Sequence, residues 1–145
     1  MRLSAASTMD TERMGSEDWA ELQRNLEATI PVYDRINRFA TFGQDKRWRK
    51  MVRSRLPIEG KILEVGCGPG TFAEMIPDRD LTCLDPIPAM LSVAEKRVNS
   101  QRETPAKFVE ATAEEMPFED ASFDGVCSLF SFRDWYDKRA GLNEV

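Results

Sequence analysis

The stretch K-I-L-E-V-G-C-G-P-G-T, from Lys61 to Thr71, decides the fold of this chain. Its apolar run at residues 62–65 is typical of a strand buried on both faces, and residues 71–76 favour a helix. Strand, glycine loop and helix predict a ligand-binding turn, because glycines let the backbone approach a ligand and a helix N-terminus offers free N–H groups. A dinucleotide loop would need glycine where Thr71 stands, and a phosphate-binding P-loop would need a lysine that residues 62–77 lack.

Composition excludes several classes of protein. The 145 residues suffice for one domain, and the net charge of −5 argues against a general nucleic-acid binder. No apolar run approaches the roughly 18 residues of a membrane span, and the N-terminus lacks the hydrophobic core of an export signal. Histidine is absent, which removes Ser-His-Asp and Cys-His catalysis and H-E-x-x-H zinc sites. The cysteines form no C-x-x-C pair, so we expect reduced thiols, a cytoplasmic protein and no metal.

Residues 1–60 are predicted to form a flexible tail and an N-terminal helical cap. Residues 1 to about 15 are polar and aperiodic and predict disorder. A helix is expected from Ser16 until Pro31 ends it, and a second, short helix from about Tyr33. A third is expected over residues 44–56, with an apolar stripe of Trp48, Met51, Val52 and Leu56. Its other face is strongly basic and carries Lys46, Arg47, Arg49, Lys50, Arg53 and Arg55.

Residues 61–145 alternate strands with helices. Further strands are expected at residues 81–84, 106–109 and 125–130, which predicts an α/β fold with a doubly wound parallel sheet. The expected strand order is 3-2-1-4, with ligand bound at the carboxyl ends of strands 1 and 4. The chain stops soon after strand 4, whose edge would be left unpaired. We therefore expect either a fragment, incomplete at its C-terminus, or a partner such as a second copy covering that edge.

The acid Glu64 followed by G-x-G-x-G (Gly66, Cys67, Gly68, Pro69, Gly70) resembles motif I of the class I S-adenosylmethionine (SAM) methyltransferases. The resemblance implies a Rossmann-like core with SAM as cofactor. Asp85 ends the second strand, where an acid can accept hydrogen bonds from both ribose hydroxyls; the alternative role is helix capping. For Glu64 we expect contact with the methionine ammonium, directly or through water, and the alternative is capping of loop N–H groups.

Two later segments also resemble that family. Residues 111–118, A-T-A-E-E-M-P-F, are similar to its adenine-holding segment, where Ala113 would offer a backbone N–H and Thr112 replaces the usual Asp. Ile87, which follows Pro86, and Met116 are expected to pack against adenine or to belong to the core. Residues 123–130 resemble the family's strand 4, so Ser128 and Leu129 are expected to flank the methionine portion and the transferring methyl group.

Tyr33-Asp34-Arg35-Ile36-Asn37 and Ser131-Phe132-Arg133-Asp134 are similar to segments of the ubiquinone/menaquinone C-methyltransferases, although Asp134 replaces that family's Asn. The resemblance implies methylation of a ring carbon of a lipid-soluble phenolic precursor. Arg133 would stabilise the phenolate, and Tyr33 or water would accept the proton. The alternative for Arg133 is an ion pair with Asp134 or Asp137. The basic helix face fits either a membrane with anionic headgroups or plain solvation.

Three other functions stay open. The chain could bind SAM without turnover as a regulatory or partner-completed protein. A nicotinamide-dependent dehydrogenase is a second alternative, against which Thr71 argues. A methyltransferase for a different small molecule is the third, because SAM-binding residues do not discriminate between acceptors.

Overall fold

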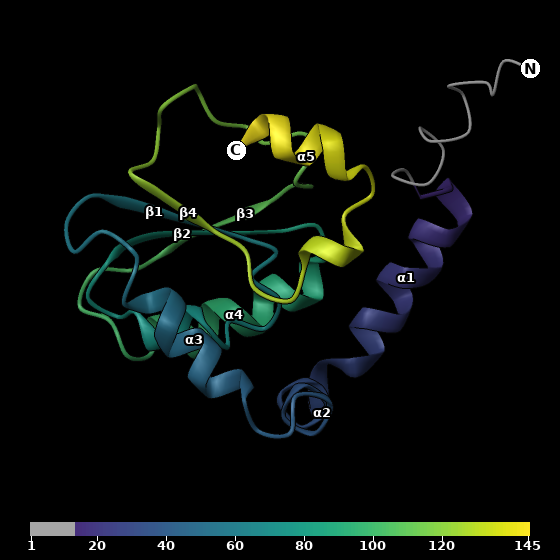
Figure 1. Cartoon of the computed structure of the whole chain (residues 1–145), viewed down its shortest axis with the longest axis horizontal. Coiled ribbons are helices and arrows are strands. Elements are labelled where there is room, and N and C mark those ends of the chain that lie inside the picture. Colours follow the sequence, from purple (N-terminus) through teal and green to yellow (C-terminus); the bar gives the residue numbers. More distant parts are fainter. Residues whose placement is uncertain (1–13) are drawn as a thin grey trace, which may run out of the picture.

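Four parallel strands form the centre of the computed structural model, which describes residues 14–145. They are β1 (Lys61–Val65), β2 (Asp80–Asp85), β3 (Lys107–Glu110) and β4 (Gly125–Cys127), in the order β3-β2-β1-β4 (Figure 1). Leu63 of β1 lies opposite Thr82 of β2 and Val126 of β4. The α/β fold and the predicted 3-2-1-4 order are therefore confirmed.

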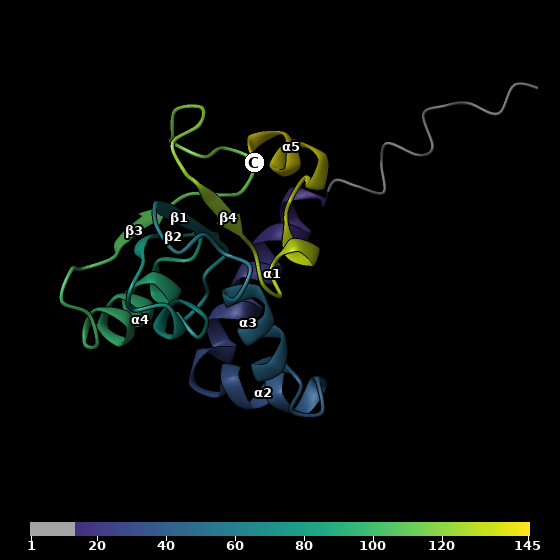
Figure 2. The same cartoon turned by 60° about the vertical axis from the view of Figure 1, so that its left-hand side comes forward.

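Helices cover both faces of this sheet. Helices α3 (Asp45–Arg53) and α4 (Pro88–Asn99) lie on one face, and α5 (Lys138–Glu144) lies on the other (Figures 1 and 2). The core divides accordingly: one cluster includes Phe72, Ile76 and Val98, and the other includes Leu63, Val65 and Trp135. Residues 62–65 of β1 are buried without alternation, as a strand covered on both faces requires.

The first two helices of the chain form an arm, called here the N-terminal arm, beside the carboxyl ends of the strands (Figure 1). Helix α1 (Ser16–Thr29) continues through a 3₁₀ turn (Ile30–Val32) directly into α2 (Tyr33–Ala40). As expected, α1 ends just before Pro31, which stands in the first turn of the 3₁₀ segment, where proline is tolerated. Asp34 anchors α2 to the body: its carboxylate accepts the Thr71 hydroxyl at 2.6 Å and the Arg97 guanidinium at 2.9 Å.

Four sequence-based expectations were wrong in detail. The helix predicted over residues 71–76 is only a 3₁₀ turn (Ala73–Met75). The strand predicted to reach Phe130 ends at Cys127, and Phe130 itself adopts φ +64°, which is incompatible with a strand. On α3, Arg49 was expected on the exposed basic face, yet Asp45 and Arg49 are both buried. Trp48 and Met51, expected to be apolar and inward, are 38% and 45% exposed.

Cys67, Cys83 and Cys127 are all buried free thiols. Within residues 14–145, no helix is long and apolar enough to cross a membrane. Apart from Met14 and Gly15, the tail predicted to be disordered lies outside the described residues.

Candidate functional site

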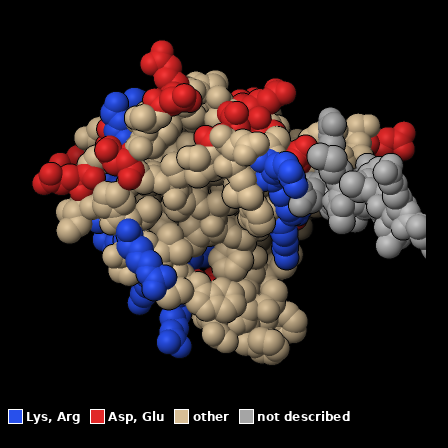
Figure 3. Space-filling model, turned by 45° about the horizontal axis from the view of Figure 1, so that its top comes forward, with Lys and Arg blue, Asp and Glu red and all other residues tan. Residues whose placement is uncertain are grey.

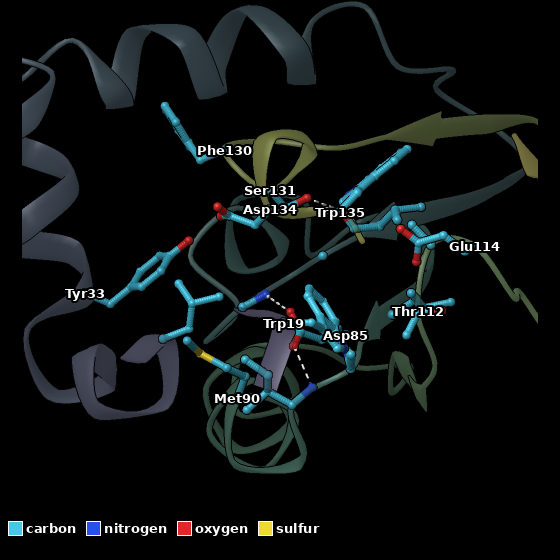
Figure 4. Close-up of a pocket in the computed structure, with 18 residues that line it drawn as sticks. Trp19, Tyr33, Asp85, Met90, Thr112, Glu114, Phe130, Ser131, Asp134 and Trp135 are labelled. Carbon is cyan, nitrogen blue, oxygen red and sulfur yellow. Dashed lines mark hydrogen bonds between the residues drawn. The ribbon is translucent and has the colours of Figure 1, made fainter. Parts of the chain in front are cut away.

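A cavity opens at the carboxyl ends of the strands, between the sheet and the N-terminal arm (Figure 4). Its floor comes from the glycine loop and from the ends of β1 and β2. Its walls come from α1, α2, the segment after β3 and the segment after β4. The lining residues that matter most are Trp19, Leu26, Tyr33, Gly66, Gly68, Asp85, Ile87, Met90, Thr112, Ala113, Phe130, Ser131 and Asp134.

The glycine loop is tied to both of its neighbours. The backbone N–H groups of Gly66 and Cys67 donate to the Leu84 carbonyl at 2.7 and 3.0 Å. The Ser131 hydroxyl donates to the Val65 carbonyl at 3.0 Å. Gly66 adopts φ +71°, and a Cβ at this position would overlap with the Ser131 side chain. Glycine at this position therefore allows the segment after β4 to close against the loop.

Asp85 stands at the centre of the floor (Figure 4). Its carboxylate accepts the Gly68 N–H at 2.8 Å and the Ile87 N–H at 2.9 Å, one on each oxygen. Burial raises the pKa of Asp85 to about 6, against the lowering effect of these two N–H donors, so the group is ionised at pH 7. Because each carboxylate oxygen offers two lone pairs, one acceptor site on each oxygen remains for a ligand. Asp85 is not the N-cap of α4; that position belongs to Ile87.

Glu64 does not line the cavity. It is 2% exposed, below the glycine loop, and its Oε2 atom has no hydrogen-bond partner in the described structure. Burial raises its pKa to about 8, and the nearby Arg49 guanidinium only partly opposes this shift. Glu64 therefore holds its proton at pH 7 in this structure.

Eight residues proposed from the sequence are brought together at the cavity: Tyr33, Gly66, Gly68, Asp85, Pro86, Ile87, Thr112 and Ala113. Others lie elsewhere. Cys67 belongs to the core, and Gly70 packs against Ala94 and Val98 of α4. Met116 packs on the opposite face of the sheet, Leu129 is buried in the core, and Ser128 is exposed. The Arg133 side chain is 78% exposed and pairs with Asp134, Nε to Oδ1, at 3.5 Å, which is one of the two roles considered for it.

Several lining residues were not singled out from the sequence. Trp19 and Leu26 of α1 are seven residues apart, which places them on one face of the helix, but nothing in this spacing shows that the face meets the cavity rather than the core. Phe130 lines the cavity with a positive φ, and the periodicity of apolar residues does not reveal such a backbone conformation.

Tyr33 and Asp134 point into the cavity from different walls (Figure 4). Burial raises the pKa of both side chains, so Tyr33 keeps its proton at neutral pH.

This arrangement fits the adenosyl portion of SAM. An ionised, buried carboxylate with free lone pairs suits a pair of ribose hydroxyls, and the side-chain-free loop beside it lets a ligand approach the backbone. Apolar side chains line the cavity, among them Trp19, Leu26, Ile87 and Met90, and such a lining suits a flat aromatic ring. Thr112 and Ala113 stand at the far end, with a hydroxyl and a backbone N–H that could meet the ring edge.

Comparisons with known proteins show which family the chain resembles. A family model described as "Methyltransferase domain" matches residues 63–145. Demethylmenaquinone methyltransferase of Thermotoga maritima is 33% identical over 138 residues, which cover 90% of this chain and 58% of that protein. Ubiquinone/menaquinone biosynthesis C-methyltransferase UbiE of a Geobacter species is 29% identical, with 90% and 59% covered. The chain thus spans somewhat over half the length of these relatives.

The fold of one solved structure is also similar to that of this chain. It is a SAM-dependent methyltransferase of Thermotoga maritima, described as a possible histamine N-methyltransferase. It superposes with a TM-score of 0.66 and 25% identity, covering 81% of this chain and 52% of that one. With the family model matching more than half of its residues, the chain belongs to the SAM-dependent class I methyltransferase family.

Proposed function

We propose that this chain binds SAM in the cavity and takes part in methyl transfer to a small molecule. The observation that carries the proposal is the buried Asp85 carboxylate, held by Gly68 and Ile87 at the end of β2 with one acceptor site free on each oxygen. SAM supplies an electrophilic methyl group on a sulfonium, so the protein's main task is alignment and exclusion of water. Trp19 and Leu26 of α1 place apolar surface over the cavity for that purpose.

For the acceptor we propose a quinone precursor methylated at a ring carbon. Two relatives are named for menaquinone or ubiquinone biosynthesis, at identities of 33% and 29%. Such an acceptor is lipid-soluble, so the proposal includes peripheral contact with a membrane. A phenolic ring carbon becomes nucleophilic when its hydroxyl group loses a proton, which requires a base near the cavity.

Among the described residues, we favour Asp134 as this base. It lines the cavity, whereas Arg133 is mostly exposed and its guanidinium cannot lose a proton. Tyr33, whose pKa burial raises, would be a hydrogen-bond donor to the acceptor oxygen instead. Burial also raises the pKa of Asp134, which brings a carboxylate closer to the pKa of a useful general base. Because the ubiquinone/menaquinone C-methyltransferases carry Asn at this position, such a base would be particular to this chain. Asp134→Asn is expected to lower the turnover rate at least tenfold while leaving SAM affinity within twofold.

Calorimetric titration tests the SAM site directly. SAM and its demethylated product should bind wild type, NADH should not, and Asp85→Asn should weaken SAM binding roughly ten- to hundredfold, from the ~1.5–3 kcal/mol of a charged hydrogen bond. Asp120→Asn, at an exposed acid in a loop, is the control and should bind normally. Transfer of a labelled methyl group from SAM to a demethylmenaquinone analogue then tests the acceptor.

A second candidate is a SAM-binding protein that needs a partner for turnover. It is supported by the outer edge of β4, which pairs with no strand within residues 14–145. A second copy of the chain covering that edge is one form of it. SAM binding with no methyl transfer by the isolated chain, and transfer restored in a larger assembly, would favour this candidate.

A further inference from the structure

The turn between α2 and α3 exposes aromatic side chains that nothing in the described structure covers. Phe39, near the end of α2, is 85% exposed, and Phe42, in the turn, is 91% exposed. Ile36, one helical turn before Phe39, is 47% exposed. Isolated exposed apolar residues are ordinary, but three of them within seven residues at one corner of a protein form a patch. We call Ile36, Phe39 and Phe42 the apolar tip.

The backbone at this tip holds a phenylalanine in a conformation that glycine normally adopts. The Gly43 N–H donates to the Arg38 carbonyl at 2.7 Å, and the Phe42 N–H donates to the Phe39 carbonyl at 3.1 Å. These two bonds make a Schellman motif, in which Phe42 occupies the left-handed position that glycine normally fills. Phe42 adopts φ +51° there, a strained conformation for a bulky residue. Neither backbone preference nor packing within residues 14–145 explains a phenylalanine at this position.

The stretch that contains the tip is rich in exposed cations and poor in acids. Between residues 35 and 55 the only acid is Asp45, which is 3% exposed. The exposed cations of the same stretch are Arg35, Arg38, Lys46, Arg47, Lys50, Arg53 and Arg55. The chain as a whole carries −5, so positive charge is concentrated on this corner. Figure 3 shows Lys and Arg side chains at the lower left of its view, with others at the upper left and on the right, whereas Asp and Glu lie mostly along the upper part.

We propose that the α2–α3 corner is a membrane-docking surface, which inserts Phe39 and Phe42 among the headgroups and acyl chains of an anionic bilayer while the flanking Lys and Arg side chains contact its phosphates. An apolar tip flanked in the sequence by exposed cations matches a bilayer surface, which is apolar below and negative above. Nucleic acid would match the cations, but it gives no reason for an aliphatic residue such as Ile36 beside the aromatics.

This surface rests on the proposed function and explains how its acceptor could arrive. Tyr33, the first residue of α2, lines the cavity, and Phe39 lies six residues further along the same helix. At 1.5 Å of rise per residue the two positions are about 9 Å apart along the helix axis. The same helix would therefore touch both the bilayer and the site that receives a lipid-soluble acceptor.

The strain at Phe42 gives a clean test. Phe42→Gly removes the apolar group and also suits the left-handed backbone, so it should fold at least as stably as wild type. Its binding to vesicles of an anionic and a zwitterionic phospholipid should be at least tenfold weaker than that of wild type. Arg38→Glu/Arg47→Glu should lose about fivefold or more per charge, from the ~1 kcal/mol of each basic residue near such a surface. Leu142→Ser, at an exposed apolar residue of α5 on the other face, is the control and should bind like wild type.

The outcomes separate this surface from the proposed function. Loss of vesicle binding in Phe42→Gly with SAM affinity unchanged supports the docking surface. Vesicle binding equal to wild type in Phe42→Gly overturns it, as does wild-type protein that binds SAM but ignores anionic vesicles; the SAM site survives both results. A Phe42-dependent dimer by sedimentation velocity, or Phe42-dependent binding of an oligonucleotide in place of vesicles, would also overturn the surface in favour of a second copy or of nucleic acid.

Discussion

The guanidinium of Arg49 lies over the ring of Phe130, 4.9 Å from its centroid. This contact joins α3 to the segment after β4, where Phe130 holds a strained φ of +64° and forms part of the cavity wall. Asp45, one turn before Arg49 on α3, lies 4.0 Å from the guanidinium. A buried cation and a ring thus fix one wall of the proposed SAM site from behind.

Arg49→Met is expected to destabilise the fold by about 3–5 kcal/mol, because it leaves Asp45 as a buried charge without a partner. Asp45→Asn/Arg49→Met should recover much of the loss, since it removes both charges. Arg47→Met, at an exposed neighbour, should stay within about 0.5 kcal/mol of wild type. Urea unfolding of the four proteins checks the order, and equal stabilities of Arg49→Met and Arg47→Met would contradict the role of Arg49.

Sequence features close to each strand predicted the sheet, but they did not predict the contact between Arg49 and Phe130. The apolar runs, glycines and turn residues each lie within a few positions of the strand that they define, and alternation with helices sets the parallel order. Arg49 sits among Lys46, Arg47 and Lys50, and nothing local distinguishes it from them. Its burial depends on Phe130, which the sequence analysis placed in a strand. The floor of the cavity, with Gly66, Gly68 and Asp85, could be found because motif and spacing share one short segment, whereas the walls needed the arrangement of α1 and of the segment after β4.

SAM affinity should decrease as the pH is lowered, because Asp85 becomes protonated. Its pKa is raised to about 6, so protonation begins to remove the acceptor charge below that pH. We expect nearly constant affinity between pH 7 and 8 and a decrease below pH 6 that approaches tenfold per pH unit. Calorimetry at several pH values checks this, with Asp85→Asn as the reference, because titration of the ligand itself affects both proteins equally. An equally steep decrease in Asp85→Asn would assign the effect to another group.

Glu64 should make the protein less stable as pH rises. The folded carboxyl holds its proton up to about pH 8, whereas the ordinary value is 4.5, so the folded state binds more protons throughout that window. Stability therefore falls as pH increases from about 4.5 to 8. Glu64→Gln cannot ionise and should become the more stable protein at the upper end. Thermal unfolding between pH 6.5 and 8.5, a range above the pKa of Asp85, isolates the effect of Glu64. Parallel curves for the two proteins would show that Glu64 is already ionised at pH 6.5.

Gly66→Ala tests whether the segment after β4 must close against the glycine loop. Gly66 adopts φ +71°, and its new Cβ would overlap with the Ser131 side chain, which is fixed by its bond to the Val65 carbonyl. Gly43→Ala is a matched control, because Gly43 has φ +78° and no atom lies within 4 Å of the place that a Cβ would take there. Gly43→Ala should lose only the roughly 1–2 kcal/mol of unfolding free energy that a left-handed backbone conformation costs a residue with a Cβ.

We expect Gly66→Ala to lose clearly more stability than Gly43→Ala, and SAM affinity to drop only in Gly66→Ala. The difference between the two free energies of unfolding measures the steric contribution of Ser131, since the backbone term is common to both. Ser131→Gly in the Gly66→Ala background removes the overlapping atoms and should therefore recover part of that difference. If both alanine variants lost the same free energy, the segment after β4 would not be packed against the loop, and the wall formed by Phe130 and Asp134 would have to lie farther from Asp85.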